Sequence, residues 1–151
     1  MKEIQLSRGM VTLVDDEDYE FLNQWKWSVY QRRNIFYAYR NIYIKNKITC
    51  VIMHRLITDA PKGKEVDHID HDGLNNQKSN LRICTHSQNL KNRSSSGKSK
   101  YLGVYRQYGK YIMACIAHKR IGSFKTEVAA ARAYDEVAKE LYGEFANLNF
   151  K

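Results

Sequence analysis

The stretch 67–92 constrains the fold of this chain more than any other. Its first six positions hold three aspartates and two histidines, and the acids end just before Gly73. From Gly73 to Thr126 the chain has eleven Lys and Arg and no Asp or Glu. Such a run can be an ordinary solvated surface. Beside a compact acid and histidine cluster, it more strongly indicates a polyanionic partner.

The pattern of this stretch predicts its local structure. Residues 66–69 are typical of a strand, a turn follows at Asp72-Gly73, and 79–83 leads back as a second strand. Thr85 and Gln88 form a capping box that predicts a helix through Asn92. The stretch is therefore expected to form a ββα unit.

Composition limits the class of protein. A chain of 151 residues with 43% hydrophobic residues is long enough for one ordinary domain or two small ones. It has no apolar run of membrane-spanning length and no signal-like N-terminus, so we expect a cytoplasmic protein that is not secreted. Cys50, Cys84 and Cys115 are widely spaced, which argues against disulfides and a thiolate zinc site; they are predicted to be small buried residues.

The N-terminal third predicts a small antiparallel sheet with short helices. A hairpin is expected over 3–14, and a helix opened by the acids of 15–18 would bury Phe21, Leu22 and Trp25. Aromatic and β-branched residues then predict three strands, at 27–30, 36–43 and 49–53. A further short helix is expected at 54–57.

The C-terminal third predicts a sheet packed on one helix, after a small, polar and basic linker at 94–99. Strands are expected at 101–106, 111–117 and 120–124, and Thr126 would cap a helix over 127–142 that ends at Gly143. The predicted buried face of that helix is Ala130, Tyr134, Val137, Ala138 and Leu141. The strands are basic and the helix acidic, so the sheet is expected to meet DNA.

The central cluster has the residue types that phosphodiester hydrolysis needs. A neutral imidazole at His68 can deprotonate water near physiological pH. The Asp67 carboxylate, with an amide oxygen from Asn89, would suit a hard divalent ion such as Mg²⁺ or Mn²⁺ rather than zinc.

These residues resemble the HNH nuclease motif. Asn80 and Asn89 lie twelve and twenty-one residues after His68, as in the variant of phage and intron homing endonucleases that ends in Asn. The resemblance implies that His68 is the general base and that Asp67 and Asn89 bind one metal ion. It also implies that Asn80, in the catalytic set, mainly holds the loop by hydrogen bonds.

The second half resembles the AP2 DNA-binding domain, through Tyr101-Leu-Gly-Val, Ile121-Gly-Ser-Phe, 129–135 and 146–150. That resemblance implies a three-stranded sheet that reads the major groove. Leu102 and Tyr105 depart from the usual arginines, so the target sequence cannot be inherited. The predicted fold class is α+β, with an N-terminal and HNH domain at 1–93, the linker at 94–99 and an AP2-like domain at 100–151.

The expected partner is double-stranded DNA, bound by a monomer that uses no membrane and no organic cofactor. The predicted DNA-binding residues are Arg82, Lys91, Arg93, Lys98, Lys100, Tyr105, Arg106, Tyr108, Lys110, Lys119 and Arg120. Two other hypotheses stay open at this point. One is a DNA-binding regulator that does not cleave and uses the HNH half as a scaffold. The other is a zinc-stapled interaction module.

Overall fold

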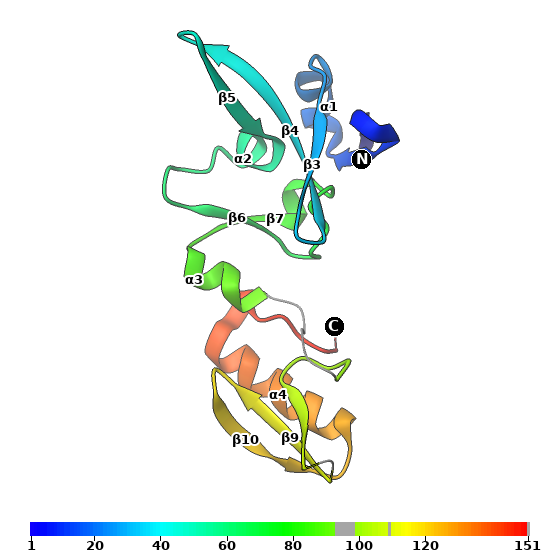
Figure 1. Ribbon diagram of the computed structural model, residues 1–151, viewed down its shortest axis with the longest axis vertical. Helices are drawn as coiled ribbons and strands as arrows, with labels where there is room; N and C mark the ends of the chain where they lie inside the picture. The colour runs from blue at the N-terminus through cyan, green and yellow to red at the C-terminus, as the bar shows by residue number, and fades with distance from the viewer. Residues whose placement is uncertain (93–98, 109, 151) are drawn as a thin grey trace. The chain divides into compact units, whose positions relative to one another are not determined.

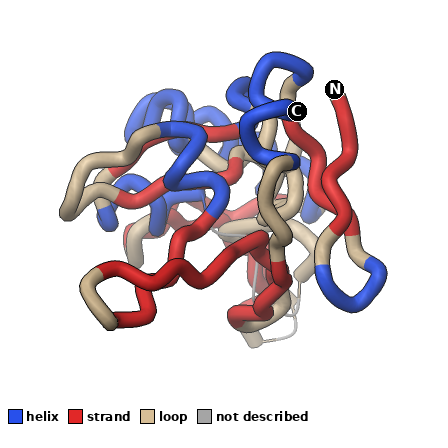
Figure 2. The backbone as a smooth tube through the Cα atoms, turned by 90° about the horizontal axis from the view of Figure 1, so that it is seen from above, coloured by secondary structure: helices blue, strands red, loops and turns tan. Residues whose placement is uncertain are grey.

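The computed structural model describes residues 1–92, 99–108 and 110–150. The chain divides into two compact units, Met1–His86 and Ser87–Lys151. Figures 1 and 2 show strands and helices, and in the described residues the strands pair in small antiparallel sheets, which confirms the α+β class. Of the predicted linker 94–99, residues 94–98 lie outside the described residues. No helix in the described ranges is both long and apolar enough to span a bilayer.

The first unit, every residue of which is described, holds three small antiparallel sheets: β1-β2, β3-β4-β5 and β6-β7. In chain order its elements are β1 (Lys2–Gln5), η1 (Ser7–Gly9), β2 (Val11–Val14), α1 (Asp16–Asn23), β3 (Ser28–Arg32), β4 (Ile35–Ile44), β5 (Lys47–Ile52), α2 (Met53–Thr58), β6 (Glu65–His68), η2 (Lys78–Asn80) and β7 (Leu81–Cys84). The predicted hairpin, sheet and central strands are all present. Part of the expected strand 79–83 is instead the 3₁₀ turn η2.

The core of the first unit joins the N-terminal hairpin, α1, the β3-β4 pair and α2. It is formed by Ile4, Leu6, Val14, Leu22, Trp27, Val29, Ala38 and Met53. The prediction that Phe21 is buried is wrong, because its side chain is 52% exposed and packs edge-on against Trp25. Neighbouring helical residues point about 100° apart, so the narrow buried stripe of α1 takes Leu22 and leaves Phe21 outside.

The β4-β5 hairpin extends past its neighbouring strand. β3 pairs only with Ile35–Tyr39, whereas Arg40–Ile44 pairs with β5 alone. Cys50 lies opposite Asn41 in this two-stranded part and is exposed, so its predicted burial is wrong. No third strand covers it there. Cys84 is buried as expected, and Cys115 is partly buried.

The second unit contains α3 (His86–Asn89, which begins at the last residue of the first unit), η3 (Leu90–Asn92), β8 (Val104–Gln107), β9 (Tyr111–Ile116), β10 (Lys119–Phe124), α4 (Glu127–Tyr142) and η4 (Gly143–Phe145). The strands form an antiparallel sheet in the order β10-β9-β8, and α4 packs on one face of it. The helix predicted after Thr85 is present as one turn of α3, continued by η3 to Asn92.

Helix α4 has the predicted bounds. The Thr126 hydroxyl accepts a hydrogen bond from the Ala129 amide at 3.1 Å, and Gly143 follows the last turn with a φ of 54°. Ala130, Tyr134 and Ala138 are buried as predicted. Leu141 is 58% exposed, against the prediction.

Candidate active site

The candidate site is built on the β6-β7 hairpin. The two strands pair antiparallel, with Asp67 opposite Arg82 and His68 opposite Leu81. Successive residues of a strand point to opposite faces, so the Asp67 carboxylate and the His68 ring leave β6 on different sides. Both side chains are nevertheless buried, at 6% exposure for each residue.

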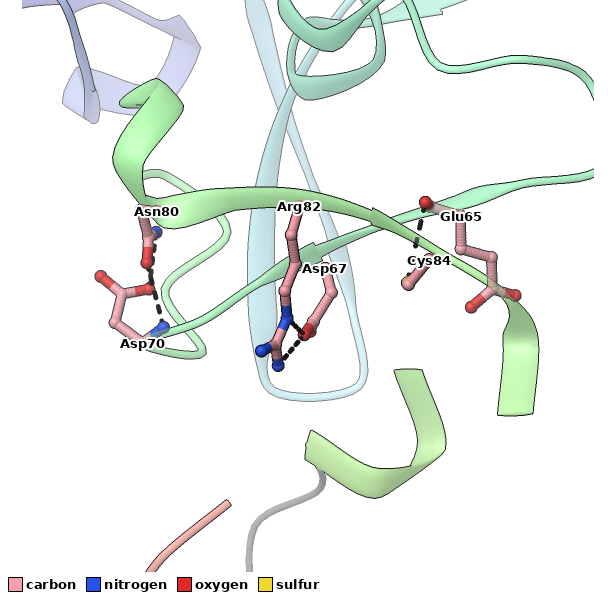
Figure 3. A network of polar contacts seen from close by, with 6 residues as sticks. All are labelled: Glu65, Asp67, Asp70, Asn80, Arg82 and Cys84. Carbon is pink, nitrogen blue, oxygen red and sulfur yellow. Dashed lines mark hydrogen bonds and ion pairs between the residues drawn. The ribbon is translucent and has the colours of Figure 1, made fainter. Parts of the chain in front are cut away.

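Asp67 is held by an arginine on the neighbouring strand. Nε and Nη2 of Arg82 donate to the same carboxylate oxygen of Asp67, at 2.8 and 2.6 Å (Figure 3). The two side chains are 7% and 14% exposed, so the ion pair is largely shielded from water. Arg82 was predicted to bind DNA, and the structure gives it this carboxylate partner.

Asn80 ties the two ends of the loop together. Its Nδ2 donates to Asp70 Oδ1 at 2.8 Å and to the Asn75 carbonyl at 2.9 Å, and its Oδ1 accepts from the Asp70 amide (Figure 3). Asp70 also accepts from the side chain of Asn75 and the amide of Asp72. Burial opposes ionisation of Asp70, but these hydrogen bonds outweigh it and lower its pKa. The loop is therefore closed by side-chain hydrogen bonds to both backbone and side-chain partners.

Gly73 is where this loop meets β4. A Cβ added to Gly73 would collide with the Phe36 carbonyl oxygen and come within 2.7 Å of the Tyr37 ring and 2.8 Å of the Ile35 side chain. The glycine is needed for close approach, since its φ is not in the left-handed region. Through this contact the β3-β4 hairpin packs beside the β6-β7 loop.

The His68 ring lies among other rings. The His54 ring meets it edge-on with centroids 5.0 Å apart, and the Tyr37 ring lies 5.8 Å away. Its Nε2 is 3.3 Å from Oδ1 of Asn76, a residue with no exposed surface. Burial lowers the pKa of His68, against the opposing effects of the Asn76 hydrogen bond and the nearby aspartates. The neutral imidazole is thus favoured.

Comparisons with known proteins identify the family to which this region belongs. A family model described as HNH endonuclease matches residues 53–91, which span α2, the β6-β7 hairpin and most of the helix after it. A protein of Acanthamoeba polyphaga mimivirus, named uncharacterized HNH endonuclease L560, is 31% identical over 140 residues, covering 87% of this chain and 74% of the viral protein. The chain belongs to the HNH endonuclease family. No solved structure gives a significant match.

The four residues of the predicted HNH set are divided between the two units. Asp67, His68 and Asn80 belong to the first unit, and Asn89 ends α3 in the second. Lys91 also lies in the second unit, with its ammonium 4.8 Å from the Tyr142 ring. Arg93 and Lys98 fall outside the described residues.

The donor atoms suit a hard cation. Asp67 and Asn89 both offer oxygen, the ligand type of Mg²⁺ and Mn²⁺. A carboxylate has two oxygens with about four acceptor positions, so Asp67 can bind a cation while it also accepts hydrogen bonds from Arg82. Among the described residues there is no group of three or more His, Cys, Asp or Glu placed to hold a metal. The zinc hypothesis therefore finds no ligand set in that part of the chain.

In the second sheet, register sorts the predicted DNA-binding residues into two faces. Tyr105 lies opposite Met113 and Arg120 opposite Cys115, on the face away from α4. Arg106 lies opposite Ile112, which packs against α4. Nε of Arg106 accordingly bonds Oε1 of Glu127, at the start of that helix, at 3.1 Å.

The remaining described candidates, apart from Lys100, lie at the ends of the strands. Tyr108 is 88% exposed, and Lys110 and Lys119 are exposed at the two hairpin turns. The Lys100 ammonium lies 4.9 Å from the Tyr101 ring. The family match ends at residue 91, so the AP2-like role of 100–151 stays a prediction.

Sequence reasoning missed two neighbours of His68. Tyr37 reaches the ring from β4, and Asn76 reaches it from the loop. Asn76 is one of several amides that follow the acid cluster in the sequence. Its complete burial is the signal that separates it from them, and burial of a loop amide is not readable from spacing.

Proposed function

We propose that this HNH family member is a site-specific DNA endonuclease of the homing type. The observation that carries the proposal is the state of His68, buried beside Asp67 with its pKa lowered, so that the neutral base is the stable form. A general base must be deprotonated at working pH before it can accept a proton from water. The HNH match over 53–91 supports the same assignment.

The other motif residues have distinct tasks in this proposal. Asp67 and Asn89 would hold one Mg²⁺ or Mn²⁺ ion, which supplies positive charge to the phosphate as negative charge develops there. Asn80 keeps the loop closed through its bonds to Asp70 and Asn75. Arg82 fixes the Asp67 carboxylate. A monomer would carry one such site and therefore nick one strand.

DNA binding is assigned to the AP2-like sheet. The face away from α4 presents Tyr105 and Tyr111, 42% and 53% exposed, together with the exposed Arg120. Aromatic and guanidinium groups on a flat sheet suit contacts with phosphates and base edges. Lys110 and Lys119 extend this basic surface at the turns. Arg106 contributes less, because Glu127 already neutralises it.

Cleavage by the His68→Ala variant tests the proposal. Purified protein would be incubated with supercoiled plasmid carrying fragments of the source genome and Mg²⁺, and nicked ends would be sequenced. Loss of the base should slow cleavage by about 10²–10⁴-fold while leaving DNA affinity nearly unchanged. His86→Ala is the matched control, since His86 pairs with Glu65 at the surface.

Two results would contradict the proposal. Full cleavage by the His68→Ala variant would remove His68 from the mechanism. Wild-type protein that binds DNA across sites and divalent metals but never cuts it would support the non-cleaving regulator instead.

A further inference from the structure

Asn76 is buried more completely than any catalytic candidate and makes hydrogen bonds in three directions. Its amide N–H donates to the Leu13 carbonyl at 2.8 Å, and its Nδ2 donates to the Thr12 hydroxyl at 2.7 Å. Its Oδ1 lies 3.3 Å from Nε2 of His68. Both Asn76 and Thr12 have no exposed surface. A buried amide with fixed partners on both atoms can act as an orienting group.

Thr12 determines which way the Asn76 amide faces. A hydroxyl has one hydrogen to donate. The other neighbours of Thr12 Oγ1 are the Leu74 carbonyl oxygen at 2.6 Å and the Met53 sulfur at 4.0 Å, and both can only accept. The hydroxyl hydrogen therefore goes to one of these, and Thr12 must accept from Asn76. Reversing the amide would place Oδ1 against an oxygen that has no hydrogen left to give.

The amide orientation in turn determines the protonated nitrogen of His68. Since Oδ1 faces the ring, Nε2 must carry a hydrogen to bond it, and the neutral imidazole then has its lone pair on Nδ1. We propose that Asn76, oriented by Thr12, holds neutral His68 in the Nε2-protonated tautomer and so makes Nδ1 the atom that accepts the proton from water. Asn76 is a positioning residue here, and its importance for cleavage rests on the proposed function of His68.

The proton transfer balances on this assignment. Water gives one proton to Nδ1, producing an imidazolium with hydrogens on both nitrogens and the Nε2–H still bonded to Asn76. The water oxygen bonds to phosphorus, and the bond from phosphorus to the 3′ oxygen breaks. Solvent protonates that oxygen, and the imidazolium returns its proton to solvent. With the other tautomer, Nδ1 would hold a hydrogen and could not take up a proton.

The tautomer can be observed directly by NMR, without DNA or metal. In full-length protein with ¹⁵N-labelled histidine at about pH 8, above the ordinary histidine pKa of roughly 6.5, correlations from ring nitrogens to carbon-bound hydrogens distinguish the two neutral forms. His68→Gln assigns the signals. Wild-type His68 should show only the Nε2-protonated pattern. If the wild-type His68 ring is protonated on Nδ1, that spectrum alone overturns the proposal.

A pair of Thr12 variants tests the orienting step. Thr12→Val keeps the side-chain shape but removes the hydroxyl, so the Asn76 amide can reverse and the Nδ1-protonated pattern should appear. Thr12→Ser keeps the hydroxyl and should retain the wild-type pattern. Identical patterns in the two folded variants would overturn the orienting role of Thr12. If Thr12→Val does not fold, Asn76→Asp tests the acceptor on Asn76 instead: its carboxylate keeps an oxygen toward Nε2 and should preserve the wild-type pattern, and loss of that pattern would overturn the proposal.

Kinetics then separate positioning from a structural role. Asn76→Ala should lower kcat by about 10²-fold, the usual scale of one proton-transfer contribution, with KM for DNA within about twofold. If the folded Asn76→Ala variant loses about as much kcat but keeps the Nε2-protonated pattern, the loss does not come from the tautomer and the proposal is contradicted. If wild-type shows the predicted tautomer yet His68→Ala still cleaves, the proposed function fails and the tautomer assignment stands.

Discussion

Arg82 donates two hydrogen bonds to one carboxylate oxygen of Asp67, and neither side chain is more than 14% exposed. The pair joins the two strands at the centre of the motif. It balances the charge of Asp67 when no cation is present, and it aims a carboxylate that has little conformational freedom. A predicted DNA-binding arginine thus has a prior task inside the HNH hairpin.

Removing this arginine should destabilise the first unit. Arg82→Ala leaves a buried carboxylate without its partner, and breaking such a pair typically costs about 3 kcal/mol of unfolding free energy. Urea unfolding measures the loss. Lys78→Ala is the control, because Lys78 pairs with Glu17 and Asp18 at the surface and its loss should change stability little. Equal stability of Arg82→Ala and wild type would show that the pair contributes nothing.

Replacing Gly103 should destabilise the second unit, through a steric clash. Gly103 has a φ of 72°, and an added Cβ would collide with the Tyr134 ring and come within 2.7 Å of the Cys115 carbonyl. Gly63 also has a positive φ, of 86°, but open space around it. Gly63→Ala should therefore cost about 1 kcal/mol of backbone strain, and Gly103→Ala distinctly more. Thermal unfolding of the two variants measures both losses of stability. Equal losses would mean that the Tyr134 ring moves aside to accommodate the added methyl group.

Local signals predicted the parts of the fold that local chemistry determines. Helix α4 follows from Thr126, Gly143 and the apolar repeat between them, and the β1-β2 hairpin follows from alternation around a Ser-Arg-Gly turn. The spacing of the motif also predicted that Asp67 and His68 lie on one strand, because both residues belong to the same short local segment.

Contacts between distant segments were not predictable in the same way. Thr12 reaches Asn76 across 64 residues, and Gly73 is required only because β4 passes beside the loop. Leu141 follows the apolar repeat of its helix but is 58% exposed, because the buried face of α4 ends before it. In each case the deciding fact is what packs against a residue, which is a property of the folded chain.

Acid should destabilise the first unit through His54. Burial, with the charges of His68 and Arg55, lowers the pKa of His54 to about 3. Between about pH 6.5 and that value the unfolded chain binds a proton that the folded chain does not, so stability falls as pH falls, by about 1.4 kcal/mol per pH unit. His54→Phe keeps a ring there and removes the titration. Between pH 6.5 and pH 5, the free energy of unfolding in urea should fall by about 2 kcal/mol less in this variant than in wild type. Parallel pH profiles would contradict this.

Salt dependence should locate the DNA-binding face of the second sheet. Each phosphate neutralised by a lysine or arginine adds about 0.9 to the slope of log affinity against log salt, because counterions are released. Replacing Lys110, Lys119 and Arg120 together by Ala should flatten that slope by about 2 to 3, measured by fluorescence anisotropy on duplex DNA with metal chelated. Arg106→Ala is the control for a base on the α4 side, and it should leave the slope nearly unchanged, since Glu127 already pairs with Arg106. If the triple variant keeps the wild-type slope, DNA is bound by another surface. If Arg106→Ala flattens it, DNA binding displaces Glu127 and brings that edge of the sheet into contact as well.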